Sequence, residues 1–246
     1  MSIGRRPAAT RKTFQRALAQ LRFSATAGFT IMVILLGASS LLACDADSVL
    51  NLLEQSVQAH KTIRTEYSRE AHSVLFGRRA PENGTLWLGP PNRYRVEAKD
   101  QVIVRGTDTL WTYSPASNQV TIRAGDLDSL EFGPAGFFGS LRADFVPVDC
   151  SAIVSENEEP QWRVRLVAKS EVAAIQRLVL WIDESDHLPA AAEYVDYNEE
   201  TSQLRFLAYH LDQHKDAQRF TFSPPPGAEV IALPLKKTHR KSDSDR

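Results

Sequence analysis

Short runs of strand-forming residues follow one another through most of this chain, and they limit what it can fold into. From Arg64 onward, Val, Tyr, Trp, Thr and Phe gather in such runs, with Gly, Pro, Asn and Asp between them. Asn83-Gly84 and Pro90-Pro91-Asn92 are strong turn signals. Because no helical pattern separates neighbouring runs, a parallel doubly wound sheet is disfavoured. The pattern predicts an antiparallel meander.

The expected strands form two series. The first covers residues 65–76, 84–88, 93–98, 101–106, 109–114 and 119–123, and the second covers residues 161–169, 175–183, 188–197, 203–210 and 218–223. Between the two series, residues 127–141 are irregular and place Phe132, Phe137 and Phe138 among glycines. We expect this stretch to form short helical turns against the sheet.

One amphipathic helix is expected before the first strand, over residues 46–63. Val49, Leu50, Leu53 and Val57 recur there at helical spacing, and acidic and hydroxyl side chains around Asp45 are available to cap its start. The helix therefore has one apolar side to place against the sheet.

The first 44 residues have the parts of an export signal. Residues 1–43 contain six basic residues and no acidic one, and no charge interrupts residues 23–44. The uncharged run is also long enough for an uncleaved membrane anchor, which remains an alternative. The sequence thus predicts an exported, periplasmic protein of residues 45–235, with residues 236–246 as a disordered basic tail.

Two cysteines are too few for a disulfide-rich scaffold or a multi-cysteine zinc site. Residues 41–45, Leu-Leu-Ala-Cys-Asp, resemble a bacterial lipobox, in which the cysteine, here Cys44, is lipidated and becomes the N-terminus. The alternative is conventional cleavage near Ala43 or Ala46. In either case we expect Cys150 to be a small core residue without a partner.

Several function classes find no support in the sequence. The exported part carries more acidic than basic residues, which argues against nucleic acid as the main partner. The common hydrolase, zinc-protease and thiol-redox motifs are absent. On a strand, His210 and His214 would stand about 13 Å apart, too far to share one metal ion. We therefore expect no enzyme, no metal site and no cofactor.

Some expected strands alternate cleanly between apolar and charged residues, as in residues 162–166, whereas others are apolar on both faces. Residues 86–88, 102–104 and 178–182 belong to the second kind. A sheet of this composition either is covered on more than one side or lines an apolar cavity, and composition alone favours simple packing against the helix.

The order of the motifs resembles the LolA family of outer-membrane lipoprotein carriers. Gly-Thr-Leu-Trp-Leu at residues 84–88 is similar to the family's G-x-L-W strand, and it is followed by Tyr94-Arg95 and by a Thr-Leu-Trp-Thr-Tyr-Ser-Pro hairpin at residues 109–115. The ending Phe-Thr-Phe-Ser-Pro-Pro-Pro-Gly at residues 220–227 is similar to the family's F-x-F-x-P-P-x-G. The resemblance covers residues 46–232.

This resemblance implies a mainly β fold with α: an unclosed antiparallel β-barrel, or curved sheet, covered by an N-terminal helix and short lid helices. It implies a monomeric periplasmic carrier that takes acylated lipoproteins from an inner-membrane transporter to an outer-membrane receptor, with their acyl chains in an apolar cavity. By alternation, the cavity is expected to be lined by Leu86, Leu88, Val96, Val102, Val104, Leu110, Val164, Leu166, Leu178, Leu180 and Phe206, with Phe137 and Phe138 on the covering segment.

One departure from the family pattern bears on the lid. Many members have an arginine immediately before a proline in L-W-x-x-R-P, where it helps to latch the lid, whereas residues 87–91 read Trp-Leu-Gly-Pro-Pro. Two rival functions remain: a receptor of the same fold anchored through a lipidated Cys44, and a hydrolase with an unrecognised site.

Overall fold

The computed structural model describes residues 44–73, 77–78, 81–124, 134–139, 141–213 and 217–233 of the 246-residue chain. The export segment and the basic tail expected from the sequence lie outside these residues, as does His214, so those expectations stay predictions. None of the described helices is long and apolar enough to cross a membrane.

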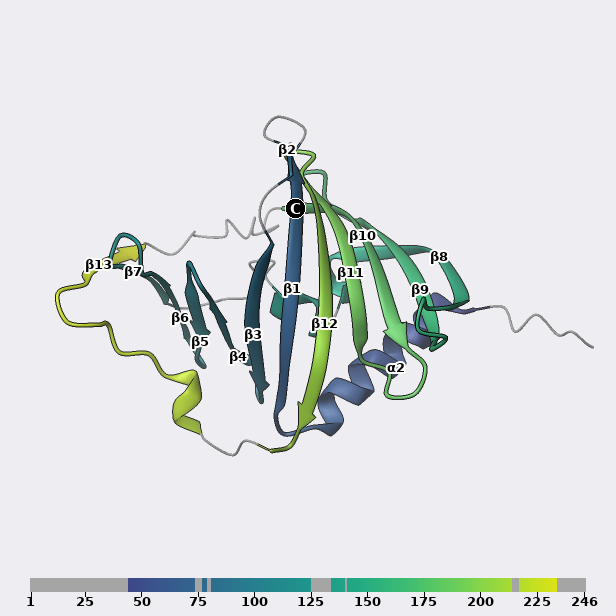
Figure 1. Cartoon of the computed structure of the whole chain (residues 1–246), viewed down its shortest axis with the longest axis horizontal. Helices are drawn as coiled ribbons and strands as arrows, with labels where there is room; N and C mark the ends of the chain where they lie inside the picture. Colours follow the sequence, from purple (N-terminus) through teal and green to yellow (C-terminus); the bar gives the residue numbers. More distant parts are fainter. Residues whose placement is uncertain are drawn as a thin grey trace, which may run out of the picture. The chain divides into compact units, whose positions relative to one another are not determined.

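The described residues form one large curved sheet in which two antiparallel meanders meet at a central strand (Figure 1). Strand β1 pairs with β3 of the first meander on one side and with β12 of the second on the other. The strand order is β13-β7-β6-β5-β4-β3-β1-β12-β11-β10-β9-β8. The bounds are β1 Ile63–Ser73, β2 Gly77–Arg78, β3 Glu82–Gly89, β4 Arg93–Ala98, β5 Val102–Arg105, β6 Thr109–Ser114, β7 Gln119–Ala124, β8 Phe145–Val154, β9 Pro160–Ala168, β10 Ile175–Asp183, β11 Pro189–Asp196, β12 Thr201–Leu211 and β13 Glu229–Leu233.

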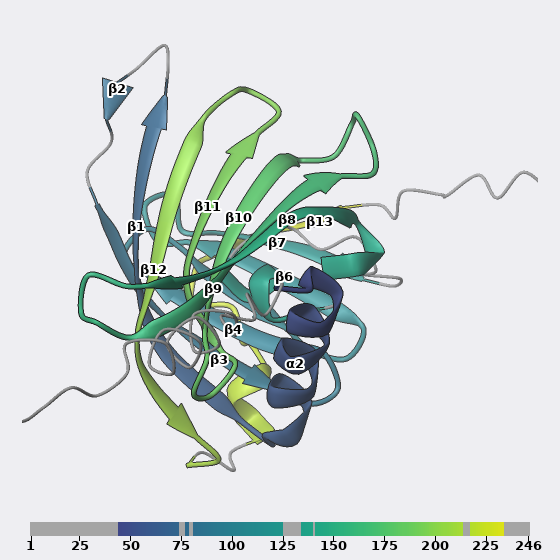
Figure 2. The ribbon, with the colours of Figure 1, turned by 90° about the vertical axis from the view of Figure 1, so that its right-hand side faces the viewer.

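One α-helix and two 3-10 turns lie on the same side of this sheet (Figure 2). Helix α2 (Ala46–Ala59) begins where the Asp45 carboxylate accepts a hydrogen bond from the Ser48 backbone N–H at 3.1 Å, and it buries Val49, Leu50 and Leu53. The turns η1 (Pro134–Phe138) and η2 (Leu141–Ala143) confirm the short helical turns expected in this region. We call the covered side the inner face and the opposite side the outer face.

One expected strand was wrong, and the strands β8 and β13 of the structure were not expected. Strand β8 was missed because Pro147 interrupts its pattern, and a proline is tolerated there because β8 lies at the edge of the sheet. The strand expected at residues 218–223 is instead the 3-10 turn η3 (Ala217–Phe220) followed by chain without strand pairing. The edge of β7 is occupied by β13, which pairs with it in parallel.

The C-terminal segment explains why the first meander is apolar on both faces. The Arg219 guanidinium lies 5.0 Å from the ring centre of Trp87 on the outer face, and Phe222 contacts Tyr113. A Cβ at Gly89 would stand 2.6 Å from the ring of Phe220, so a larger residue there would displace this ring. Each face of the first meander is therefore covered by the protein itself.

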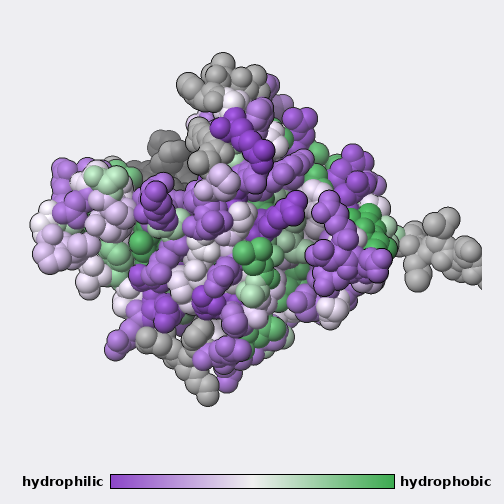
Figure 3. Space-filling model, in the orientation of Figure 1, coloured by the Kyte–Doolittle hydropathy of each residue, from purple (hydrophilic) through white to green (hydrophobic). Residues whose placement is uncertain are grey.

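The outer face over the central strands is hydrophilic, with small separate apolar spots (Figure 3). On β12 the outward residues Arg205 and Leu207 are exposed, whereas Leu204 and Phe206, which alternate with them, are buried on the inner face. This alternation is the pattern of a sheet that is dry on one side and wet on the other.

Cys44 and Cys150 form a disulfide, so the expectation that Cys150 has no partner was wrong. The bond joins the residue just before α2 to the edge strand β8, and spacing in the sequence gave no sign of this pairing because 106 residues separate the two cysteines. Lipidation of Cys44 would need the same sulfur. Disulfide formation and lipidation of Cys44 therefore exclude each other.

We expect Cys150→Ser to lower the free energy of unfolding by about 2–5 kcal/mol, because the bond closes a long loop in the unfolded chain. Denaturant unfolding of the exported protein measures the change, and reduction of the wild-type protein serves as the matched control. A free Cys150 thiol in the native protein, together with an unchanged free energy of unfolding in Cys150→Ser, would show that the bond does not form.

Candidate lipid-binding site

Strand register brings most of the expected cavity residues to the inner face. Leu86 lies opposite Val96, Leu178 opposite Leu166, and Leu180 opposite Val164, so the side chains of each pair point the same way. The structure places the following expected residues together in, or packed against, one buried apolar cluster: Leu86, Leu88, Val96, Leu110, Val164, Leu166, Leu178, Leu180, Phe206, Phe137 and Phe138.

Val102 and Val104 do not belong to this cluster, and their assignment to the inner face was wrong. Val104 lies opposite Trp111, and Val102 lies opposite Tyr113, whose ring contacts Phe222 on the outer face. Ile103 takes the inner position instead, opposite Val96. Because all three residues are apolar, the pattern of this strand did not distinguish its two faces.

Aromatic side chains of η1 fill the space above the inner face. Phe138 packs edge-on against Phe206 at a ring distance of 5.1 Å and also contacts Tyr209, while Phe137 contacts Tyr194 at 5.7 Å. Both phenylalanines are almost completely buried. The apolar interior is thus closed by the protein's own rings.

A cavity of about 440 Å³ remains beside this aromatic cover. It lies between the end of α2, the turn from β3 to β4, and the turns η1 and η2. Its apolar lining includes Val57, Ile63, Leu88 and Phe138. The volume falls within the range of small-molecule binding sites. Of its lining residues, the sequence singled out Leu88 and Phe138, whereas Val57 and Ile63 were expected only as parts of a helix.

Polar side chains line the cavity as well. Arg105 and Tyr94 contribute to the lining, and they lie opposite each other on β5 and β4. Burial raises the pKa of the Tyr94 hydroxyl, and the positive charges of Arg105 and Arg123 oppose part of that rise. The sequence did not identify these residues as cavity residues. In the sequence, a Tyr or Arg of a strand looks the same whether its side chain lines a cavity or lies on the surface.

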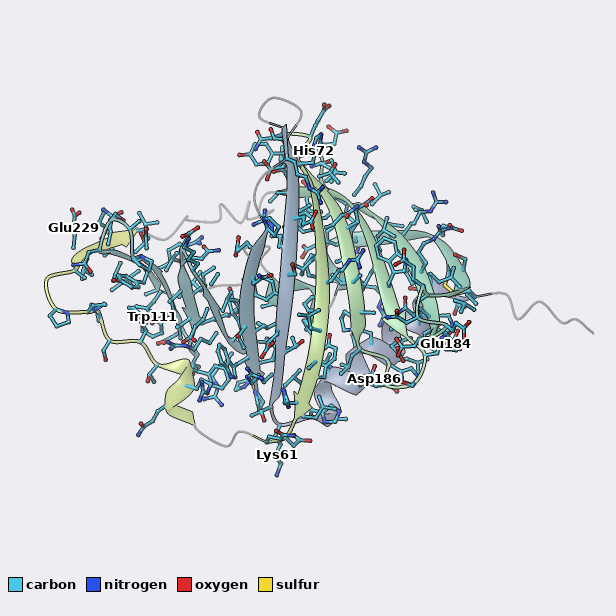
Figure 4. The ribbon with its side chains drawn as sticks, viewed as in Figure 1. Lys61, His72, Trp111, Glu184, Asp186 and Glu229 are labelled. Carbon is cyan, nitrogen blue, oxygen red and sulfur yellow. A yellow bond between two sulfur atoms is a disulfide. The ribbon has the colours of Figure 1, made fainter. Side chains whose placement is uncertain are left out.

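The end of α2 nearest the cavity is tied to the end of β12. The Asp212 carboxylate contacts His60 Nδ1 at 2.9 Å and accepts a hydrogen bond from the Lys61 backbone N–H at 2.6 Å. Figure 4 shows Lys61 at this end of β1 and His72 at the other. The helix is also held along its length, where the Arg142 guanidinium donates to Glu54 at 3.2 Å and the Ser56 hydroxyl donates to the Asp186 carbonyl at 2.6 Å.

A second group of charges lies on the inner face near the other end of β1. Arg69 donates to the Ser202 hydroxyl at 3.2 Å and lies 3.7 Å from Glu82 and 3.9 Å from Glu200. The Tyr67 hydroxyl donates to Glu82 at 3.2 Å. The carboxylates neutralise this arginine, so the interior ends here in a compensated polar network. Within the described ranges, no group of His, Cys, Asp and Glu is arranged to hold a metal ion.

Comparison with known proteins shows the family of this chain. The model of the family described as outer membrane lipoprotein carrier protein LolA matches residues 58–223. The chain belongs to the LolA family. The recognition made from the motifs of the first meander and from the Pro-Pro ending is therefore confirmed.

Curated LolA relatives cover most of the chain. The outer-membrane lipoprotein carrier protein of Methylibium petroleiphilum is 30% identical over 195 residues, which span 77% of this chain and 92% of the relative. That of Alkalilimnicola ehrlichii is 28% identical over 173 residues, or 69% and 77% of the two chains. Among solved structures, an uncharacterized conserved protein from Thermus thermophilus superposes with a TM-score of 0.51 at 14% identity, covering 76% of this chain and 99% of that protein, which shows likeness of fold.

The contacts of Asp212 predict a pH-dependent stability. Hydrogen bonds from His60 and then from the Lys61 backbone hold the pKa of the Asp212 carboxyl below its ordinary value of 3.8. A carboxyl whose pKa is lowered in the folded state stabilises the fold at neutral pH. This stabilisation is lost as the pH falls through the pKa that the carboxyl has in the folded state. We expect Asp212→Asn to be less stable than the wild type at pH 7, and the gap to narrow as the pH falls below about 4 towards the lowered pKa of the folded state.

Thermal unfolding from pH 3 to pH 8 measures this gap. Asp100→Asn, at an exposed turn without such contacts, should leave the wild-type profile unchanged. A gap of constant size at every pH would contradict the assignment of the stabilisation to the ionised Asp212 carboxylate.

Proposed function

We propose that this LolA-family protein carries acylated lipoproteins through the periplasm, with their acyl chains against the inner face of the sheet. The observation that carries the proposal is a continuous apolar inner face whose cover at η1 consists of a short turn with two phenylalanines. The curated relatives named outer-membrane lipoprotein carrier proteins support it. In this proposal the protein is a monomer and not an enzyme.

The free energy of hydration explains why such cargo needs a carrier. Transfer of an acyl chain of about 16 carbons into water is unfavourable by about 13 kcal/mol, at about 0.8 kcal/mol for each methylene group. A lipoprotein therefore leaves one membrane for another only when an apolar surface replaces the bilayer around its chains. The inner face of the sheet has the composition of such a surface.

The packing of η1 indicates how the surface becomes available. Phe137 and Phe138 contact Phe206, Tyr194 and Tyr209 through apolar ring faces and edges. An acyl chain that displaces these rings exchanges one set of apolar contacts for another, so the net free energy of loading is small compared with the hydration term. Loading and release are then both feasible for one carrier.

Pro90 and Pro91 line the cavity. They stand at the position in the sequence where many family members have an arginine followed by a proline. A proline side chain has no hydrogen-bond donor with which to latch a lid. In our proposal the ring contacts of Phe138 take over this role, so that the closed state depends on apolar packing. Arg93, close by, donates from Nε to the Pro90 carbonyl at 2.6 Å and so stabilises the turn itself.

Partners are part of the same proposal. The family implies an inner-membrane transporter that delivers the lipoprotein and an outer-membrane receptor that accepts it. Acidic over basic charge in the exported part, together with the hydrophilic outer face in Figure 3, suits a protein that moves through the periplasm between two membranes. We propose no nucleic-acid partner.

A charge placed in the cavity tests the proposed function. We expect Leu88→Asp to weaken capture of a fluorescent triacylated peptide by about tenfold or more, because an ionised carboxylate does not enter apolar surroundings without a large loss of free energy. Capture is measured by fluorescence polarisation on protein whose folding is checked by circular dichroism.

Leu207→Asp is the matched control, because Leu207 is an exposed leucine of the same sheet on the outer face. It should capture the peptide as the wild type does. The proposed site is wrong if folded Leu88→Asp protein captures the peptide normally, or if both variants lose capture equally.

A further inference from the structure

Arg105 is a charged residue of the cavity whose charge the described structure does not balance. Its side chain projects from β5 on the inner face, level with Tyr94 and Leu110 on the neighbouring strands. The Nε atom is buried and has no hydrogen-bond partner. Asp144 also lines the cavity, yet no ion pair joins it to Arg105.

Two other arginines on this side of the sheet, Arg69 and Arg142, have carboxylate partners. Arg69 has Glu82 and Glu200 within 4 Å, and Arg142 has Glu54 at 3.2 Å. A half-buried guanidinium without a carboxylate raises the free energy of the folded state, because burial removes part of its hydration and no opposite charge compensates for the loss. A protein that keeps such a group in a cavity gains from any ligand that brings a negative charge.

The size of the cavity limits the apolar part of such a ligand. At roughly 30 Å³ for a group the size of a water molecule, 440 Å³ has room for about 15 methylene groups, which is one acyl chain. Val57, Ile63 and Leu88 supply apolar walls, and Arg105 supplies positive charge, to which Arg93 at the turn from β3 to β4 adds. The cavity as it stands is therefore suited to a single chain with one charged end.

We propose that this cavity binds a single-chain amphiphile with an anionic head group, the chain against Leu88 and Phe138 and the head group at Arg105. The proposal rests on the proposed function in one respect, namely that acyl chains enter at the inner face. It adds a ligand class that lipoprotein carriage does not require. A fatty-acid carboxylate and a phosphate monoester share the needed chemistry, because both accept two hydrogen bonds from one guanidinium.

Three probes with the same chain test the head group. Dodecanoate, dodecyl phosphate and the neutral 1-dodecanol are titrated into the full exported protein by isothermal calorimetry at pH 8. We expect at least one anion to bind about tenfold more tightly than the alcohol, which corresponds to one charge-assisted hydrogen-bonded contact. The tighter of the two anions identifies the source as a fatty acid or as a phosphate head group.

Variants of Arg105 separate recognition of charge from apolar binding. We expect Arg105→Gln to abolish the preference for the anion over the alcohol and Arg105→Lys to restore part of it. Arg205→Gln, on the exposed outer face, is the matched control and should keep the wild-type preference. Loss of the unbalanced charge should also leave the melting temperature of ligand-free Arg105→Gln unchanged or raised.

The outcomes are distinct from those of the lipoprotein experiment. Equal affinity of the wild type for all three probes, or a full anion preference in Arg105→Gln, overturns this inference while capture of the triacylated peptide continues to support the carrier. Failure of the wild type to capture that peptide, with tight binding of an anion at Arg105, overturns the carrier and leaves this site in place.

Discussion

The structure depends on the burial of one apolar face of a curved sheet. Leu86, Leu166 and Leu180 of three different strands lie on that face and are almost completely buried. A sheet of this length without cover would expose a large apolar surface to water, which is unfavourable by about 25 cal/mol for each Å². Helix α2 and the turns η1 and η2 provide the cover, and in the proposed cycle an acyl chain takes the place of part of it.

The two kinds of cover are held differently. Helix α2 is fastened by the Cys44–Cys150 disulfide at its start and by the His60–Asp212 contact at its end, with polar contacts from Arg142 between them. Turn η1 presents Phe137 and Phe138, which pack through aromatic contacts. Since covalent and charged contacts hold position whereas apolar contacts exchange readily for others, in the proposed cycle α2 is the fixed wall and η1 is the part that cargo replaces.

Local patterns predicted much of this architecture. The strands at residues 93–98, 109–114 and 175–183 have the expected bounds, because their breakers and alternation are strong. What failed depends on contacts between distant segments: the disulfide across 106 residues, and the parallel pairing of β13 with β7. The strand register decides which residues share a face of the sheet. Only the register shows that Val104 lies on the outer face and that Arg105 lies on the inner face.

A photo-crosslinking residue in place of Phe138 reports whether cargo takes the place of the η1 rings. The exported protein with this residue is loaded with a lipoprotein that carries radiolabelled acyl chains and is then irradiated. We expect labelling of the protein through the acyl chains at position 138 and none when the same residue replaces exposed Leu207. Labelling at position 207 with none at position 138 would show that the chains bind elsewhere.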